Sequence, residues 1–330
     1  MKLLSLLFVA TLLLVNSFQQ SQEPAELQEA RTLNESAVKL FNQGKYDEAM
    51  PLAKRALQIR EKLLPRTDEQ ISSSLTNLGE IYLAQKDYKQ AKEIFLRLLQ
   101  IQEELFGGDD PNLSFTLDRL AVLYYVAGNY NETEEAYKRG LALREKSLGE
   151  NDALVAQSWF ALGEFYRFRR ELKPSLESYK KALTIYAARG GIMTPDFERA
   201  ADGIACLGYD HRKRELFEEL RTLRRQLSGR EAPRDPNEGG VMNGRALSLP
   251  QPEYPGAAAA RRLRGTVIVK VEVDETGTVV NARDMCQGPP FLSEAAVAAA
   301  WKARFSPTSL DGVPVKVSGI IQYNFTSRFR

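Results

Sequence analysis

A pattern that returns every 42 residues limits the folds open to this chain more than any other property. Its anchors are Tyr46, Tyr88 and Tyr130 and, more weakly, Leu172. In the same register a small residue precedes each anchor and recurs once more beyond them: the series is Ala37, Gly79, Ala121, Gly163 and Ala205. Small residues let two helices approach closely, and aromatic side chains fill the space around the contact. A fixed period of this length is typical of a solenoid rather than of one closed core.

Each period is interpreted as two helices joined by a short turn. In the first period, helices are expected over residues 33–42 and 47–63, with Gly44 in the turn. The connections between periods, at residues 65–68, 107–111, 149–152 and 190–195, are rich in Gly, Pro and Asp. Each Asp or Thr in them is placed to cap the helix that follows.

The repeat block resembles tetratricopeptide repeats, and its stretch ALQIREK at residues 56–62 resembles the kinesin light chain variety. The resemblance covers residues 26–227 and implies four helical pairs and a degenerate fifth. It also implies that the first helix of each pair lines a concave face that binds extended peptides.

Projecting the family register onto this chain places six candidate peptide contacts on that face: Asn34, Asn77, Arg119, Tyr125, Phe160 and Arg167. Asn and Arg side chains can hydrogen-bond a peptide backbone or a carboxylate, and Tyr and Phe can pack against its side chains. The alternative is that Phe160 and Tyr125 are core residues between repeats and that Arg119 is a solvated charge.

After a predicted linker over residues 228–249, rich in Gly, Pro, Asn and charge, the hydrophobic period changes. Alternating valines over residues 267–273 predict a half-buried strand, and residues 278–285 a second strand of a hairpin. An alanine-rich stretch over 292–305 predicts a helix capped by Ser293, with Ala296, Ala300 and Phe305 toward the sheet. Alternation over 315–325 predicts a third strand.

This C-terminal order resembles the TonB C-terminal domain, over residues 250–327. The resemblance rests on the P-x-Y-P entry at 252–255, the turn at 273–277, the Arg-Phe-Ser-Pro run at 304–307 and the Tyr-Asn-Phe ending at 323–325. One departure is that Trp301 stands two positions before the place where such domains often carry Trp, which here is Ala303; we expect Trp301 to be partly exposed. The predicted fold class is therefore an α-solenoid of tetratricopeptide helical hairpins followed by a small α+β domain.

The TonB resemblance implies a binding module of the bacterial cell envelope that engages an extended segment of outer-membrane transporters by strand addition. The last strand is the predicted docking edge, because an edge strand presents unpaired N–H and C=O groups. Its residues are Val315, Val317, Gly319, Ile321, Tyr323 and Phe325. The alternative is that Lys316 or the tail at 327–330 blunts this edge.

The first residues resemble a secretory signal. Met1-Lys2 is followed by an apolar run over 3–15, which is shorter than the roughly 20 residues that a membrane-spanning helix needs. We expect a signal peptide over 1–17 and a periplasmic protein. The alternative is that the apolar run stays as an inner-membrane anchor.

Nothing in the sequence predicts catalysis, a cofactor or a metal site. Cys206 and Cys286 fall in different predicted domains and are interpreted as two separate small apolar residues, with a disulfide as the alternative. His211, the only histidine, has no acidic or thiol cluster in its motif. A formal net charge of +2 gives no argument for nucleic acid as a partner.

These patterns predict a non-enzymatic periplasmic adaptor. Its partners would be proteins or extended peptide segments of the cell envelope, one bound by the repeats and one by the TonB-like domain. The alternative is a TonB-type energy transducer in which residues 3–15 remain as the anchor. Peripheral membrane contact and a dimer through the C-terminal domain stay open.

Overall fold

The computed structural model describes residues 24–228, 245–260, 262–310 and 312–326. The chain divides into two compact units, residues 1–147 and 148–330, and each is described by itself. The predicted signal peptide and most of the predicted linker lie outside the described residues. Within the described ranges, no helix combines the length and apolar character that a membrane span requires.

The first unit consists of three helical hairpins, as the 42-residue period predicts. The helices are α2 (Ala25–Asn42), α3 (Tyr46–Leu63), α4 (Glu69–Ala84), α5 (Tyr88–Phe106), α6 (Leu113–Val126) and α7 (Tyr130–Leu148). The recurring small residue allows the close packing: a Cβ on Gly79 would lie 2.7 Å from Cζ of the buried Phe95 ring. Asp68 caps α4, since its carboxylate accepts a hydrogen bond from the Gln70 amide (2.8 Å).

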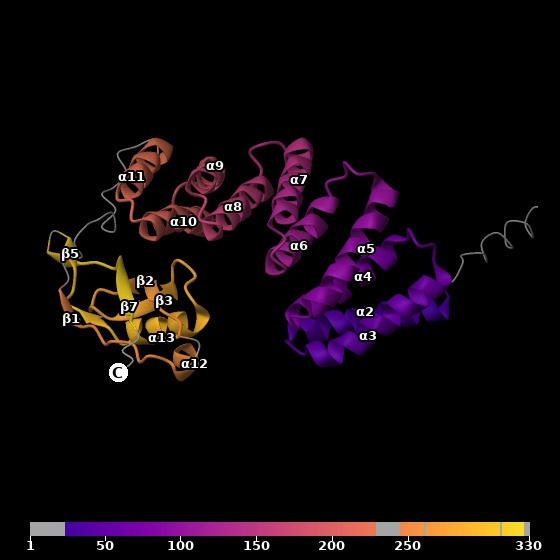
Figure 1. Ribbon diagram of the computed structural model, residues 1–330, viewed down its shortest axis with the longest axis horizontal. Helices are drawn as coiled ribbons and strands as arrows, with labels where there is room; N and C mark the ends of the chain where they lie inside the picture. The colour runs from indigo at the N-terminus through magenta and orange to yellow at the C-terminus, as the bar shows by residue number, and fades with distance from the viewer. Residues whose placement is uncertain (1–23, 229–244, 261, 311, 327–330) are drawn as a thin grey trace, which may run out of the picture. The chain divides into compact units, whose positions relative to one another are not determined.

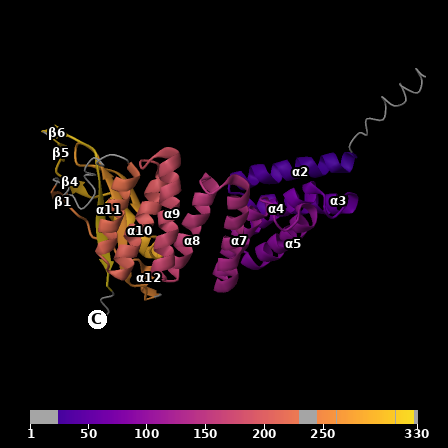
Figure 2. The same cartoon turned by 90° about the horizontal axis from the view of Figure 1, so that it is seen from above.

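The second unit begins with two more hairpins. Its helices are α8 (Ala153–Phe168), α9 (Leu172–Gly190), α10 (Pro195–His211) and α11 (Glu215–Ser228), of which α9, α10 and α11 lie side by side in Figure 2. Asp152 and Thr194 cap α8 and α10 through their side chains. Tyr179 is fully buried, and Cβ atoms on Gly163 and Gly203 would both fall within 2.7 Å of its ring.

The same unit contains a small domain built on a three-stranded antiparallel sheet with the order β3-β2-β7. The strands are β2 (Gly265–Val273), β3 (Val279–Asp284) and β7 (Val317–Phe325). Two short pairs lie beside it, β1 (Ala246–Ser248) with β4 (Arg304–Phe305), and β5 (Ser309–Leu310) with β6 (Val313–Pro314). The helices are α12 (Gly256–Ala260) and α13 (Pro290–Ala300).

The two faces of this sheet are covered by different parts of the unit, with α13 and α10 on opposite sides in Figure 1. The valines of β2 predicted to be buried pack with Ala296, Ala300 and Tyr323 in the core under α13. Ile268 points to the other face and packs with Ala205 and Cys206 of α10. The alternation of β2 therefore separates two interfaces, both of them inside this unit.

Three details of the C-terminal domain differ from the sequence prediction. Helix α13 ends at Ala300, and Phe305 lies in β4, where it pairs with Ala246 of β1; its amide also donates to the Gly277 carbonyl (2.9 Å). Gly277 has φ 87°, and a Cβ there would lie 1.8 Å from the Phe305 carbonyl oxygen, so this turn requires glycine. Phe305 is still buried against the sheet as expected.

The other two differences are at strand and helix starts. Ser293 lies inside α13 and is not its cap; the helix begins at Pro290, a residue suited to the first turn because it lacks an N–H. The last strand begins at Val317. Val315 lies outside the strand, because its amide donates to the carbonyl of Thr308, the residue before β5 (2.8 Å). Trp301 is partly exposed, as expected.

Candidate functional sites for partner binding

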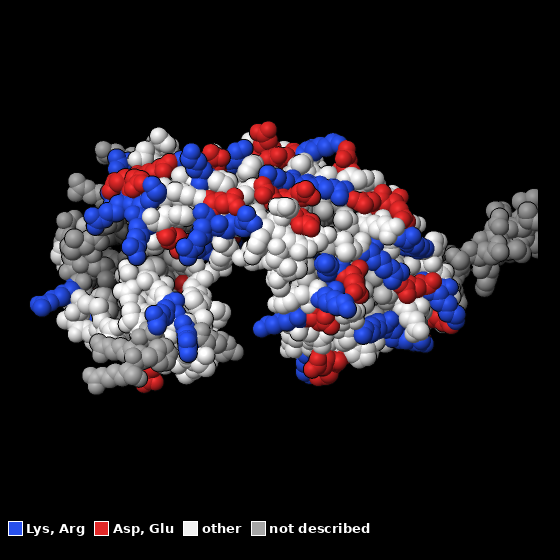
Figure 3. All heavy atoms as spheres, in the orientation of Figure 1, with Lys and Arg blue, Asp and Glu red and all other residues white. Residues whose placement is uncertain are grey.

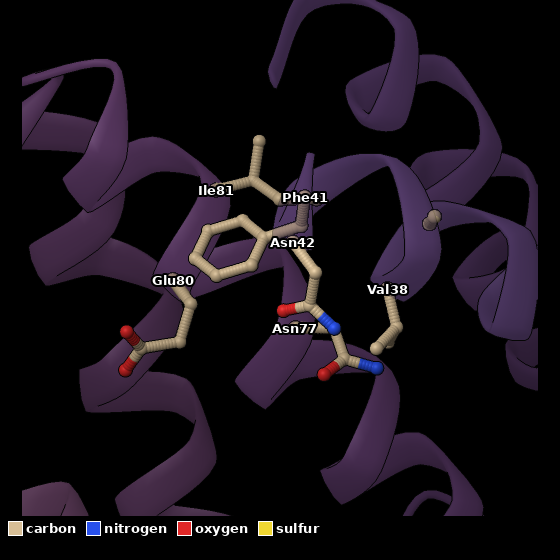
Figure 4. A pocket seen from close by; sticks show the side chains of 7 residues that line it. Val38, Phe41, Asn42, Asn77, Glu80 and Ile81 are labelled. Carbon is tan, nitrogen blue, oxygen red and sulfur yellow. The ribbon is translucent and has the colours of Figure 1, made fainter. Parts of the chain in front are cut away.

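The first unit carries a pocket of about 180 Å³ between α2 and α4. Figure 4 shows the side chains that line it. Val38, Phe41 and Ile81 supply an apolar lining, and Asn77 and Glu80 supply polar groups. The pocket therefore combines apolar contacts with hydrogen-bonding groups.

Two polar pairs extend from this pocket. Asn77 Nδ2 donates to Asn34 Oδ1 (2.9 Å), and Arg119 Nε donates to Glu80 Oε1 (2.6 Å). The structure thus brings together Asn34 and Asn77 as one pair and joins Arg119 to Glu80, a residue that the sequence analysis missed. The sequence alone could have suggested Glu80, because it follows Asn77 by three positions and so lies on the same helix face.

Helix α6 adds exposed apolar side chains next to Arg119. Phe115, Val122 and Val126 are exposed, and their spacing with Arg119 puts all four on one face of the helix. The Arg119 guanidinium lies 4.8 Å from the centre of the Phe115 ring. Tyr125 lies to the side of this stripe, with its ring 5.8 Å from that of Tyr130.

In the second unit, Phe160 and Arg167 occupy a more enclosed setting. The Phe160 ring lies 5.9 Å from the Tyr179 ring. Arg167 is only 6% exposed and pairs with Glu164 (3.1 Å) and Asp210 (3.2 Å). Burial opposes its charge, but these carboxylates outweigh burial and raise the pKa of the Arg167 guanidinium.

The C-terminal domain reaches this cluster. Gln287, in the loop between β3 and α13, donates from Nε2 to Glu164 Oε2 (3.4 Å). Glu164 also accepts a hydrogen bond from Tyr179, and burial, followed by this carboxylate, raises the pKa of the Tyr179 phenol. A peptide that used Arg167 would therefore have to compete with groups of the chain itself.

The same loop is covalently joined to α10. Cys206 and Cys286 form a disulfide, with Cα atoms 5.5 Å apart. The interpretation of two separate apolar cysteines is wrong. The bond depends on α10 packing on the outer face of the sheet, and nothing in a sequence separation of 80 residues reveals such packing.

Charged groups surround the disulfide at the contact between α10 and the sheet. Lys270 Nζ bonds Glu198 Oε2 (3.0 Å) and Asp202 Oδ1 (2.9 Å), and Arg283 pairs with Asp202. Burial alone would raise the pKa of Glu198, but the charges of Arg224 and Lys270 outweigh it and hold that pKa below its usual value. The contact thus combines an apolar patch, ion pairs and a covalent bond.

The candidate docking strand β7 lies at an edge of the sheet, and among the described residues it pairs only with β2. Four of its six predicted residues, Val317, Ile321, Tyr323 and Phe325, turn into the core, so they anchor the strand. Its outward side chains include Ile320, Gln322 and Asn324. Lys316, one position before the strand, pairs with Glu272 of β2 (2.6 Å).

The charge distribution fits protein partners of mixed polarity. On the face shown in Figure 3, Lys and Arg side chains are interspersed with Asp and Glu over the helices, in agreement with a formal net charge of +2. Within the described residues, no group of three or more His, Cys, Asp and Glu side chains could hold a metal ion.

Comparison with known families agrees with both halves of this description. Residues 28–104, 70–146 and 114–188 match the model of the tetratricopeptide repeat family. Residues 250–326 match the model described as Gram-negative bacterial TonB protein C-terminal. No significant match was found among curated protein sequences.

Solved structures resemble the helical part. One is a kinesin light chain-like protein of Podosopora anserina with nearly identical TPR-like repeats; it is 20% identical, with a TM-score of 0.53, over 62% of this chain and 98% of that chain. Another is BtubC (BKLC) from P. vanneervenii, which is 17% identical, with a TM-score of 0.52, over 70% of this chain and 92% of that chain. At such identities the likeness concerns the fold alone.

Proposed function

The chain is a tetratricopeptide repeat protein with a C-terminal TonB-type domain, and on this premise we propose that it is a non-enzymatic periplasmic adaptor that holds two protein partners. Both families support a role in protein–protein interaction. The C-terminal domain would bind an extended segment of an outer-membrane transport protein. The first three hairpins would bind a second envelope protein.

The observation that carries this proposal is the position of β7. It is nine residues long, lies at the edge of the sheet, and is anchored by side chains in the core. An added strand would gain its affinity from main-chain hydrogen bonds along this edge and its specificity from alternate side-chain contacts. Ile320 is 44% exposed beside this edge and would contact the added strand.

Photocrosslinking in cells tests this role of β7. A photoreactive residue at Ile320 should trap an outer-membrane transport protein, identified by mass spectrometry. The matched control is Val280, which is 42% exposed on β3 at the opposite edge of the sheet. Equal trapping from both positions, or none from Ile320, would contradict strand addition at β7.

The second binding surface is proposed from the polar pairs and apolar stripe of the first unit. Replacing Asn77 and Arg119 together with Ala should weaken binding of the partner that the first unit captures, because it removes one member of each polar pair. Truncating side chains that hydrogen-bond a partner typically costs about 1–3 kcal/mol, or roughly 5- to 150-fold in Kd. The control is Arg97→Ala on α5, an arginine of similar exposure that pairs with Glu61 instead.

Localisation is tested by fractionation. Release of the chain by osmotic shock, with a mature N-terminus near Phe18, is the expected result for a periplasmic adaptor. Retention in the inner membrane with Met1 intact would instead favour the energy transducer, in which residues 3–15 act as the anchor.

A further inference from the structure

The contact between α10 and the sheet has the composition of a small, separable interface. Its buried apolar residues are Ala205, Cys206, Ile268 and Met285. Lys270 and Arg283 of the sheet bond to carboxylates of α10, and Asp202 among these is buried, so that the cost of removing its charge from water offsets much of the attraction. Interfaces of this kind within a chain resemble transient protein–protein contacts, for which relative motion is the default.

The disulfide changes that expectation. Cys206 lies on α10 and Cys286 just after β3, so one covalent bond crosses the interface at its apolar centre. The bond keeps the two surfaces at a very high effective concentration. With the bond intact, the weak ion pairs and the small apolar patch need only orient the surfaces.

We propose that the Cys206–Cys286 disulfide is a reversible latch that locks the C-terminal domain onto the last helical pair, and that a protein dithiol opens it. This goes beyond the adaptor role, because it assigns a redox-controlled state to the molecule. The latch holds the loop with Gln287 against Glu164, the carboxylate that pairs with Arg167.

The two cysteines differ in exposure, and this difference favours attack at Cys286. Cys206 is 1% exposed, whereas Cys286 is only partly buried. A thiolate of the reducing dithiol attacks Cys286 Sγ, the S–S bond breaks, and Cys206 leaves as a thiolate that takes up a proton. The second thiol of the reductant then attacks the mixed disulfide, releases Cys286 as a thiol, and leaves the reductant as a disulfide. Two electrons pass from reductant to protein.

Opening has a structural consequence for binding. It uncovers the carboxylates of α10, the ring of Tyr209 and the outer face of β2, which holds Ile268. It also removes the Gln287 hydrogen bond from Glu164, the carboxylate that pairs with Arg167. The reduced chain therefore offers a surface that the oxidised chain covers with its own domain.

Hydrogen exchange on the full chain, with and without dithiothreitol, tests the latch. Reduction should speed amide exchange at least tenfold in peptides from α10 and from the turn at residues 284–288. Peptides from α13, which packs on the other face of the sheet, should keep their protection. Reoxidation should restore the original pattern.

Two results of this experiment would overturn the proposal. Unchanged exchange in α10 after reduction, verified by thiol titration, would mean that noncovalent contacts alone hold the interface. Fast exchange in α13 as well would mean that the disulfide is needed for the domain to fold and does not act as a latch.

The variant Lys270→Ala separates the covalent contribution from the ionic one. In the oxidised form it should exchange like the parent, because the disulfide persists. After reduction it should exchange faster than the reduced parent, because the ion pairs to Glu198 and Asp202 are gone. Fast exchange in the oxidised variant would show that the ion pairs, and not the disulfide, hold the interface closed, and this result would contradict the proposal.

Discussion

Glycines carry the closest helix contacts, because each leaves room for an aromatic ring of the partner helix. Gly79 faces Phe95 and Gly163 faces Tyr179, and both glycines fall in the 42-residue register, so their role could be predicted from the sequence. Gly203 meets the same Tyr179 ring but lies two positions before the register residue Ala205. No sequence period could predict that contact, because it depends on how α10 packs against α9.

Replacing Gly79 with Ala should destabilise the first unit by about 1–2 kcal/mol. Overpacking a core typically costs 1–3 kcal/mol, while Gly→Ala in a helix returns up to about 1 kcal/mol. The clash dominates because the added Cβ would lie 2.7 Å from a ring atom of Phe95, which is fully buried. Urea unfolding followed by far-UV circular dichroism measures the change.

The control for this prediction is Gly108→Ala, in the loop before α6. The nearest atom to a Cβ there is Nη2 of the Arg139 side chain at 3.5 Å, an ordinary contact. The free energy of unfolding of Gly108→Ala should stay within about 0.5 kcal/mol of that of the parent. Equal losses in the two variants would argue against the packing explanation.

Among the elements, α10 has two roles, as the first helix of the last hairpin and as the cover of the sheet's outer face. Its helical character and Thr194 cap follow from the sequence, but its second role does not. Ile268 illustrates the difficulty: strand alternation predicts it to face solvent, yet it is buried against α10. Alternation identifies the two faces of a strand but does not tell whether the second face finds a partner.

The ion pairs of α10 should make this interface sensitive to acid. Burial would raise the pKa of Glu198, but the charges of Arg224 and Lys270 outweigh burial and hold that pKa below its usual value in the folded chain. A lowered carboxyl pKa contributes stability that is present above the unfolded pKa and is lost as pH falls through the folded pKa. Glu198→Gln should therefore be less stable than the parent near pH 7, and the difference should shrink progressively as the pH falls below about 4.5 toward the lowered pKa of the folded chain.

Unfolding free energies of the two proteins across pH 7 to 3 provide the measurement. Other carboxylates, including Asp202, are present in both proteins, so their contributions largely cancel in the difference. Glu177→Gln, which removes a carboxylate at an exposed position of α9, is the matched control. A constant gap between Glu198→Gln and the parent at every pH would contradict the ion-pair explanation.

The whole molecule consists of two compact units whose boundary falls within the repeats, not between repeats and C-terminal domain. The sequence predicts the five hairpins and the small sheet, because period and alternation are local signals. It does not predict that the last two hairpins pack in one unit with the sheet. That arrangement rests on the Cys206–Cys286 bond and the Lys270 ion pairs, which join residues far apart in the sequence.

This division predicts that two spectroscopic signals will separate on unfolding. Both tryptophans, Trp159 and Trp301, lie in the second unit, so fluorescence reports that unit alone. Gly79→Ala should lower the urea midpoint seen by circular dichroism but leave the fluorescence midpoint unchanged. Gly163→Ala, which places a Cβ 2.7 Å from Tyr179, should shift both.

If Gly79→Ala lowered the urea midpoint seen by fluorescence as much as the midpoint seen by circular dichroism, this prediction would be contradicted. It would mean that the repeats unfold in one cooperative transition across the boundary of the two units.

The chain contains two cysteines, and they form the disulfide. Only one intramolecular pairing is possible, so oxidation cannot produce isomers with mispaired disulfides. Maturation needs an electron acceptor but no disulfide isomerase, and the single competing product is a chain crosslinked to another molecule. Since Cys206 is synthesised before Cys286, it must stay unreacted until the sheet has formed and brought its partner into place.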